Sequence, residues 1–157
     1  MRRILPSAVA CLVLLAPSLA AAADLALSPA DTAAAYKAAG YKQQGRKWMA
    51  CAEGKVTTAR DINGDGLPDV VITESGTQCH GMTGEGYSLV SKQPDGSWRV
   101  LSAGTGMLDF LKGPTVKGWP DIQIGGPGFC FPVHRFNGRE YVFNRSEYEG
   151  KRCKPKA

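Results

Sequence analysis

Residues 61–72 read Asp61-Ile62-Asn63-Gly64-Asp65-Gly66-Leu67-Pro68-Asp69-Val70-Val71-Ile72, a polar loop that leads directly into an apolar stretch. A short apolar stretch bounded by turn residues favours a strand. No helical period persists from Lys47 onward, and further stretches of the same kind follow. They are residues 87–90, 98–101, 122–124 and 141–143. We therefore expect a mainly β fold, in the β-rich α+β class.

A second segment of the chain resembles the first. Residues 66–72, GLPDVVI, and residues 118–124, GWPDIQI, share a Gly-x-Pro-Asp pattern and an apolar continuation. Both continue into a glycine-rich stretch, a cysteine, and two strand-like stretches joined by a turn, Asp95-Gly96 or Asn137-Gly138. Because one such unit cannot bury a face alone, we expect two related antiparallel β units packed together.

The segment before these strands has the signals of one short N-terminal helix. Ser28 can cap the first turn, Pro29 suits the first helical position, and Asp31 lies three residues after the cap. Gly40 ends the alanine-rich stretch that follows. We expect a helix over residues 29–39.

The first 23 residues have the pattern of a secretory signal peptide. Two arginines follow Met1, residues 4–19 are mostly apolar, and four alanines at 20–23 offer a small-residue cleavage site. The apolar run is too short and too interrupted to serve as a membrane anchor. We expect cleavage after Ala23 and a single β-rich domain over residues 24–157, exported to the periplasm or outside the cell.

Charge and composition exclude several classes of protein. A hydrophobic share of 43% and a charged share of 21% exclude wholesale disorder. Without Arg2 and Arg3, the 19 basic residues fall to 17 against 14 acidic residues, and the net charge falls from +5 to +3. That charge is too mild to indicate nucleic acid as the partner. We interpret the basic residues within 151–156 as a solvated chain end.

Four cysteines remain once the segment with Cys11 is removed: Cys51, Cys79, Cys130 and Cys153. An even number in an exported protein predicts two disulfides, with three possible connectivities. Equivalent positions in two units related by a pseudo-twofold axis can lie close together, which favours Cys79–Cys130 and leaves Cys51–Cys153. The alternative pairing of Cys51–Cys79 with Cys130–Cys153 stays open.

The polar loop has the alternation of oxygen ligands that calcium prefers. Side-chain oxygens stand at loop positions 1, 3, 5 and 9, glycine at position 6 permits a sharp turn, and position 7 can offer its carbonyl. Three carboxylates within nine residues repel one another unless a cation binds between them. Position 12 is Ile72 rather than glutamate, so the loop is not an EF-hand. The predicted ligands of a structural Ca²⁺ are Asp61, Asn63, Asp65, Leu67 and Asp69.

With Arg60 before it, this loop resembles the calcium loop of FG-GAP/VCBS-type repeats, in which an Asp-x-Asn-x-Asp-Gly-x-x-Asp loop leads into a strand. The resemblance covers residues 56–75 and implies Ca²⁺ bound at the edge of a β-propeller blade. A domain of residues 24–157 is too short for the usual set of blades, and in the second copy only Asp121 matches the ligand Asp69. More broadly, the chain resembles small exported bacterial proteins that carry one such repeat.

The sequence has no phosphate loop, dinucleotide fingerprint or Gly-x-Ser-x-Gly motif. We therefore expect a non-enzymatic binding or structural protein of the cell envelope, with an envelope protein or glycan as its partner. An exposed aromatic or apolar patch would support this role. The alternative is a small hydrolase acting on an envelope component, which would need both histidines to meet a carboxylate in one cleft. Its candidate acid/base residues are Glu74, His80, Asp109 and His134.

Overall fold

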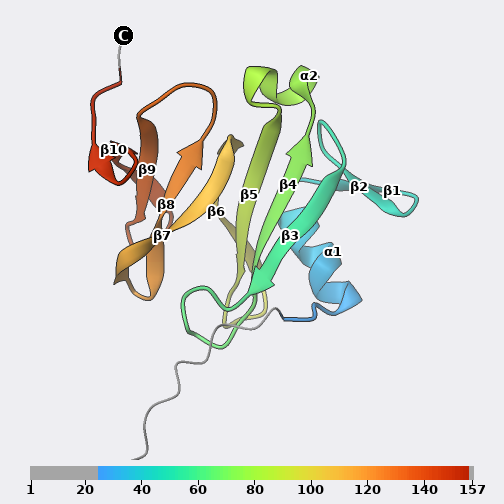
Figure 1. Cartoon of the computed structure of the whole chain (residues 1–157). Helices are drawn as coiled ribbons and strands as arrows, with labels where there is room; N and C mark the ends of the chain where they lie inside the picture. Colours follow the sequence, from blue (N-terminus) through green and yellow to red (C-terminus); the bar gives the residue numbers. More distant parts are fainter. Residues whose placement is uncertain (1–24, 156–157) are drawn as a thin grey trace, which may run out of the picture.

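The computed structural model describes residues 25–155, so the predicted signal peptide lies outside the described part. The acidic loop leads into a strand at residue 69, as predicted, and that strand is an inner strand of a four-stranded antiparallel sheet (Figure 1). The strands of this first sheet, in their order across it, are β3 (Gly54–Arg60), β4 (Asp69–Ser75), β5 (Glu85–Lys92) and β6 (Trp98–Thr105).

The second half of the chain forms a five-stranded antiparallel sheet. Its strands follow one another across the sheet in chain order, so β8 is the second strand of its sheet as β4 is of the first. The expected architecture of two antiparallel β units packed together is confirmed. The strands are β7 (Met107–Val116), β8 (Trp119–Gly125), β9 (Phe131–Phe136), β10 (Tyr141–Tyr148) and β11 (Lys151–Arg152).

The chain passes from one sheet to the other at Gly106, between the end of β6 and the start of β7. Gly106 has a φ of +140°, and a Cβ there would overlap the side chain of Ile124. Only glycine fits this corner, because it tolerates the backbone conformation and leaves room for the second sheet to approach.

A hydrophobic core fills the space between the two sheets. Each sheet contributes one face, as expected when two antiparallel sheets pack against each other. The buried core residues are Val71, Tyr87, Leu89 and Leu101 from the first sheet and Trp119, Ile122, Ile124, Phe136 and Tyr141 from the second.

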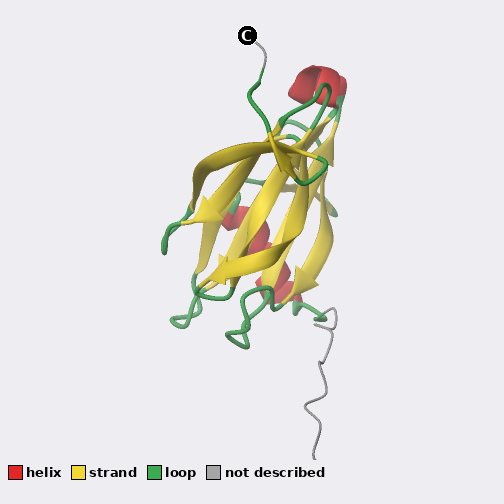
Figure 2. Ribbon diagram, turned by 60° about the vertical axis from the view of Figure 1, so that its left-hand side comes forward, coloured by secondary structure: helices red, strands yellow, loops and turns green. Residues whose placement is uncertain are grey.

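Helix α1 (Pro29–Ala38) covers the opposite face of the first sheet, behind the strands in Figure 2. Successive residues of a strand point to opposite faces. Val70 and Ile72 therefore pack with the helix, whereas Val71 enters the core between the sheets. This double coverage explains the continuous apolar run of β4. The N-terminal helix is confirmed: Asp31 donates its backbone N–H to the Ser28 hydroxyl at 3.0 Å, and the helix ends one residue before the predicted boundary.

Several short elements lie outside the predicted pattern. β1 (Lys42–Gln44) and β2 (Lys47–Met49) form a two-stranded hairpin, and α2 (Thr77–His80) connects β4 to β5 through a 3₁₀ turn, Gly81–Thr83. Among the helices of residues 25–155, none is long and apolar enough to cross a membrane.

The two disulfides correct the predicted pairing. Cys51 is bonded to Cys79, with Cα atoms 5.8 Å apart, and Cys130 is bonded to Cys153, with Cα atoms 5.7 Å apart. The preferred pairs Cys79–Cys130 and Cys51–Cys153 are therefore wrong. Cys79 lies in α2, above the first sheet, whereas Cys130 lies in the β8–β9 connection of the second, so the two equivalent cysteines are kept apart (Figure 1). Two disulfides are typical of proteins in an oxidising compartment.

Candidate metal site and other candidate residues

The loop between β3 and β4 is folded around the side chain of Asp61. Its carboxylate accepts backbone N–H groups of Gly64 at 2.7 Å, Asp65 at 3.1 Å and Gly66 at 2.8 Å. A short acidic side chain that accepts several amides of its own loop bends the chain into a tight turn. The predicted first ligand therefore organises the backbone of the loop.

Asn63 and Asp65 lie on the same turn and contact each other. The Asn63 amide nitrogen donates to an Asp65 carboxylate oxygen at 2.9 Å, and the other Asp65 oxygen accepts the backbone N–H of Leu67 at 2.8 Å. Leu67 itself is half-buried at the end of the loop. Four of the five predicted ligands are thus held within one compact turn.

Asp69, the fifth predicted ligand, is the first residue of β4 and is 0% exposed. One carboxylate oxygen, Oδ2, accepts the backbone N–H of Ile62 at 2.8 Å, while the other, Oδ1, has no hydrogen-bond partner. Burial, together with the negative charges of Asp65 and Asp61, raises the pKa of Asp69 to about 6, against the opposing effect of the Ser91 hydroxyl and the Ile62 N–H. A buried carboxylate oxygen without a partner is costly, and a bound cation would satisfy it.

The donor set of the loop fits a hard cation. Its side chains offer carboxylate and amide oxygens, the ligands that Ca²⁺ takes, and an oxygen that accepts one amide still has a free lone pair. Within residues 25–155 no three His, Cys, Asp or Glu side chains converge as a metal-binding group. Binding would require Asp61 and Asp65 to turn toward Asp69 and away from part of their own loop.

The second unit has a buried aspartate near the start of β8, and two arginines form ion pairs with it. Asp121 is 5% exposed and accepts two hydrogen bonds from Arg135, at 2.9 and 2.8 Å. Arg145 forms a further ion pair with it at 2.5 Å. The hydrogen bond from Arg135, followed by that from Arg145, holds the pKa of Asp121 below its usual value. Each sheet thus has one buried aspartate. Asp121 forms ion pairs with two arginines, whereas Asp69 forms no ion pair within the described residues.

The second unit also contacts the acidic loop directly. Lys117 and Gly118 form the turn between β7 and β8, and a Cβ at Gly118 would overlap the carbonyl oxygen of Asn63. Gly118 also has a φ of +82°, in the region that favours glycine. The loop is therefore in contact with both sheets, which the sequence pattern did not show.

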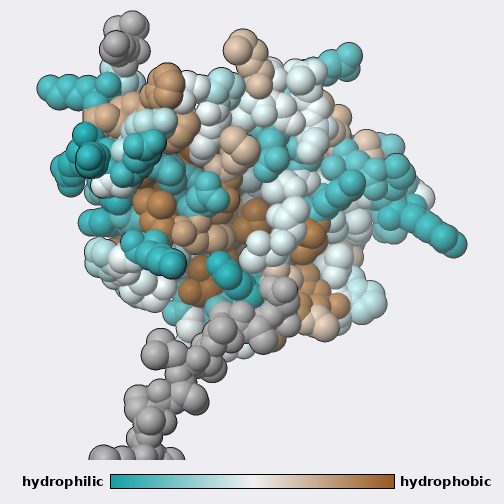
Figure 3. All heavy atoms as spheres, viewed as in Figure 1, coloured by the Kyte–Doolittle hydropathy of each residue, from teal (hydrophilic) through white to brown (hydrophobic). Residues whose placement is uncertain are grey.

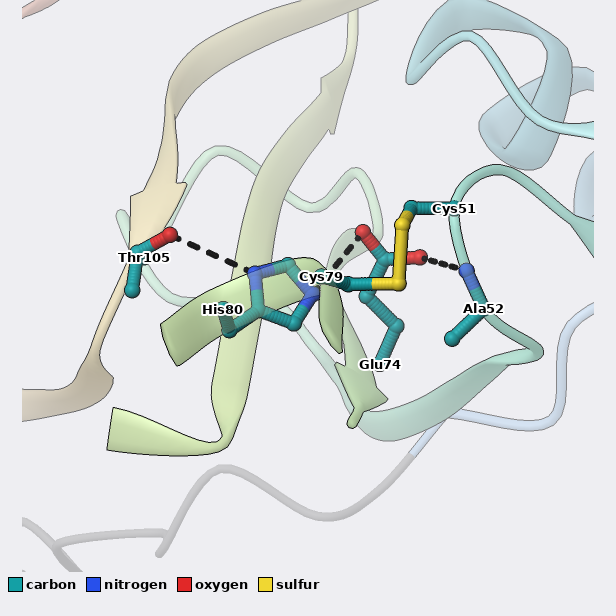
Figure 4. Close-up of a disulfide and its surroundings, with 6 residues drawn as sticks. All are labelled: Cys51, Ala52, Glu74, Cys79, His80 and Thr105. Carbon is teal, nitrogen blue, oxygen red and sulfur yellow. Dashed lines mark hydrogen bonds and ion pairs between the residues drawn. A yellow bond between two sulfur atoms is a disulfide. The ribbon is translucent and has the colours of Figure 1, made fainter. Parts of the chain in front are cut away.

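Two of the candidate hydrolase residues contact each other beside a disulfide (Figure 4). His80 Nε2 lies 3.2 Å from Glu74 Oε1, and His80 Nδ1 lies 3.3 Å from the Thr105 hydroxyl. The other Glu74 oxygen accepts the backbone N–H of Ala52 at 3.0 Å. This cluster joins α2, β4 and β6 next to Cys51–Cys79, and only 9% of the His80 side chain is exposed.

The other two hydrolase candidates lie elsewhere. His134 is on β9 of the second sheet beside Phe143, and burial lowers its pKa. Asp109 is on β7 and lines a groove of about 410 Å³ between the sheets, where Figure 3 shows apolar atoms. Neither histidine lines this groove. The hydrolase alternative needs both histidines and a carboxylate in one cleft. His80 and His134 do not lie in one cleft.

An exposed aromatic surface lies at the second disulfide. Phe129 is 76% exposed, and its ring stands edge-on to that of Tyr148, with ring centroids 5.1 Å apart. These rings line a hollow of about 490 Å³ together with Cys130–Cys153 and Lys154. Figure 3 shows hydrophilic side chains gathered nearby, over β10 and the end of the chain at the upper left. Only the folded chain brings Phe129, Tyr148 and Lys154 together.

Comparison with known proteins returns no match: no protein family, no curated protein and no solved structure matches this chain.

Proposed function

We propose that this protein is an exported, calcium-binding, disulfide-stabilised β-domain that acts as a non-enzymatic binding and structural protein of the cell envelope. The observation that carries the calcium assignment is the unpartnered Oδ1 of Asp69, 0% exposed, at the end of a loop with two further carboxylates. The comparison with Asp121 supports the calcium assignment, because that buried aspartate forms ion pairs with two arginines and Asp69 has no such cation among the described residues.

The proposed role of the metal is structural. The acidic loop contacts the second unit at Gly118 and leads into β4, a strand buried on both faces. A cation that joins Asp61, Asn63, Asp65 and Asp69 would brace this junction between the two sheets. Because the metal binds only the folded loop, its binding free energy adds to the free energy of unfolding.

The test is calcium titration of the purified protein, followed by calorimetry and by thermal unfolding. At free calcium one hundred times the dissociation constant, the expected stabilisation is about 2.7 kcal/mol. Asp69→Asn should abolish both the heat and the rise in Tm. Asp95→Asn is the matched control, because Asp95 lies in the β5–β6 turn and only caps Ser97. A wild-type protein with neither response would refute the calcium assignment.

The binding role rests on the aromatic surface at the second disulfide. Phe129 and Tyr148 present apolar rings, and the cations Lys151, Arg152 and Lys154 nearby are exposed. Exposed aromatic residues of this kind are typical of interaction sites, and the cations favour a negatively charged envelope component.

The binding role is tested by cosedimentation with a washed envelope fraction. Phe129→Ser should reduce the bound fraction severalfold, whereas Met82→Ser should leave it unchanged. Met82 is the matched control because it is 89% exposed and lies in the connection of the other sheet. Equal binding of the wild type and Phe129→Ser would contradict this surface.

A further inference from the structure

A second hollow lies where the acidic loop meets the second unit. Its volume is about 260 Å³, and its wall is formed by the loop, the β5–β6 connection and the β7–β8 turn, which gather at the lower end of the molecule in Figure 1. The residues that matter for its chemistry are Asn63, Asp65, Gln93, Arg99, Lys117 and Trp119. Trp119 is 5% exposed and belongs to the hydrophobic core, so the core forms the floor of the hollow.

Two cations of this hollow have no acidic partner. Arg99 and Lys117 both line it, both are exposed, and neither forms an ion pair within the described part of the chain. They come from different sheets, Arg99 from β6 and Lys117 from the β7–β8 turn. Cations that line one concave site and form no ion pair favour an anionic ligand.

The backbone holds Lys117 in an unusual position. Its φ is +51°, a left-handed conformation that is uncommon for residues other than glycine, asparagine and aspartate. The turn is kept there by Gly118, which is in close contact with Asn63 of the loop. The side chain of Lys117 reaches the β9–β10 turn, where its ammonium would lie 3.5 Å from a Cβ at Gly138. Positive φ at both Lys117 and Gly118 is what a two-residue hairpin turn of type I′ requires, so the turn fixes the point from which the Lys117 side chain extends.

We propose that this hollow binds a small oxyanion, the carboxylate or phosphate group of a larger molecule, and that it does so only when calcium occupies the acidic loop. The inference rests on the proposed function, because it needs the metal. Three loop carboxylates, Asp61, Asp65 and Asp69, outnumber Arg99 and Lys117 by one negative charge. A bound divalent cation reverses that balance to one positive charge.

The reversal acts over short distances. Asp65 lines the same hollow as Arg99 and Lys117, so its charge acts on the same small volume as theirs. Salt at physiological ionic strength screens charges only beyond about 8 Å. Without metal, the loop therefore repels an anion that the cations attract. With metal bound, the loop and the two cations both attract the anion. A volume of 260 Å³ suits one charged group of a larger molecule, since sites for whole drug-sized ligands occupy about 300–1,000 Å³.

The experiment is isothermal calorimetry of the full domain with three probes. They are glucuronate, which carries a carboxylate, glucose 6-phosphate, which carries a phosphate, and glucose, which carries no charge. Each is titrated in saturating calcium and again in a chelator. We expect heat from one or both anionic sugars in calcium, at least a tenfold loss of affinity in chelator, and no heat from glucose.

Two single variants locate the site. Arg99→Gln and Lys117→Gln should each weaken binding of the anionic sugar about tenfold and leave the calcium affinity within threefold of the wild type. Lys112→Gln is the matched control, because Lys112 is an exposed cation of β7 that does not line the hollow. Thermal unfolding of each variant shows whether it is folded.

The outcomes separate this inference from the calcium assignment. Calcium binding without any heat from the anionic sugars overturns the oxyanion site and leaves the proposed function standing. Equal affinity in calcium and chelator, equal affinity for glucose, or unchanged affinity of both variants also overturns it. If the protein does not bind calcium at all, the proposed function fails first and the oxyanion site fails with it.

Discussion

Asp69 is buried with one carboxylate oxygen unpartnered, so its negative charge weakens the metal-free fold. Asparagine has nearly the same shape and can still accept the N–H of Ile62. We expect Asp69→Asn to stabilise the metal-free protein by about 1–3 kcal/mol at neutral pH and to remove its response to calcium. Urea unfolding in chelator and in calcium measures both effects. A variant that is less stable without metal and still responds to calcium would contradict the site.

Asp121 is expected to behave in the opposite way, because its charge is paired. Asp121→Asn leaves the partly exposed Arg135 without its carboxylate and leaves Arg145 with its ion pair to Glu147 alone. We expect a loss of about 2–4 kcal/mol at pH 7, near the lower end of the usual cost of breaking a buried ion pair.

The stabilisation by Asp121 also depends on pH. Its pKa in the folded protein lies below the unfolded value of about 3.9. The pairs are therefore fully stabilising above about pH 4, and their contribution is lost as the pH falls through the folded-state pKa. Unfolding curves of the wild type and Asp121→Asn at pH 7 and pH 3 should show a smaller difference at pH 3. A constant difference would show that the pairs do not stabilise the fold.

At the scale of elements, each disulfide closes a loop within its own unit. The Cys51–Cys79 bond spans 28 residues and joins the β2–β3 connection to α2. In the chain-entropy model a loop of that length is worth about 3–4 kcal/mol. We expect the double variant Cys51→Ser, Cys79→Ser to lose about that much stability in urea unfolding. The double variant Cys130→Ser, Cys153→Ser is the comparison, because its loop of 23 residues predicts a similar loss.

The contact between the β7–β8 turn and the acidic loop can be tested by adding a side chain at Gly118. Gly118 and Gly96 both have a φ of +82°, but only a Cβ at Gly118 would meet another part of the chain. Gly96→Ala should therefore cost only the backbone penalty of about 1–2 kcal/mol. Gly118→Ala should cost at least about 2 kcal/mol more and should weaken calcium binding, since it displaces Asn63. Equal effects of the two substitutions on Tm would show that the contact is unimportant.

At the scale of the whole molecule, the first sheet is covered on both faces. Helix α1 packs on one side and the second sheet on the other, and this layering buries β4 and brings the acidic loop between the units. The second sheet packs only one face into the core, and the aromatic surface at Phe129 and the charged cluster at Asp121 belong to this half of the chain. The proposed envelope-binding surface at Phe129 therefore belongs to the more open half of the protein, whereas the oxyanion hollow is formed by residues of both halves.

The elements missed at the sequence level have little local signal. Lys42, Gln43 and Gln44 of β1 are polar and all exposed, so no alternation marks the strand. Helix α2 has only four residues, and it is held by the Cys51–Cys79 bond and by the contact of His80 with Glu74. Isolated helices of that length are not stable in water, because nucleation costs more than one turn returns. β1 is made by its pairing with β2 in the hairpin, and α2 is made by tertiary contacts.

Local chemistry determined what the sequence alone could predict here. The turn residues and short apolar stretches specified antiparallel strands, Ser28 and Gly40 specified the ends of α1 to within one or two residues, and the oxygen spacing of residues 61–69 specified a compact acidic turn. Such signals act between neighbours in the chain, where geometry is limited by the backbone itself.

Only the tertiary structure decided which distant residues meet. It paired Cys51 with Cys79, left one oxygen of Asp69 unpartnered while giving Asp121 two arginines, and placed Lys117 against the acidic loop. The physical reason is that these contacts depend on how two sheets pack across one core. That packing is set by the summed burial of many side chains, which no single stretch of sequence records.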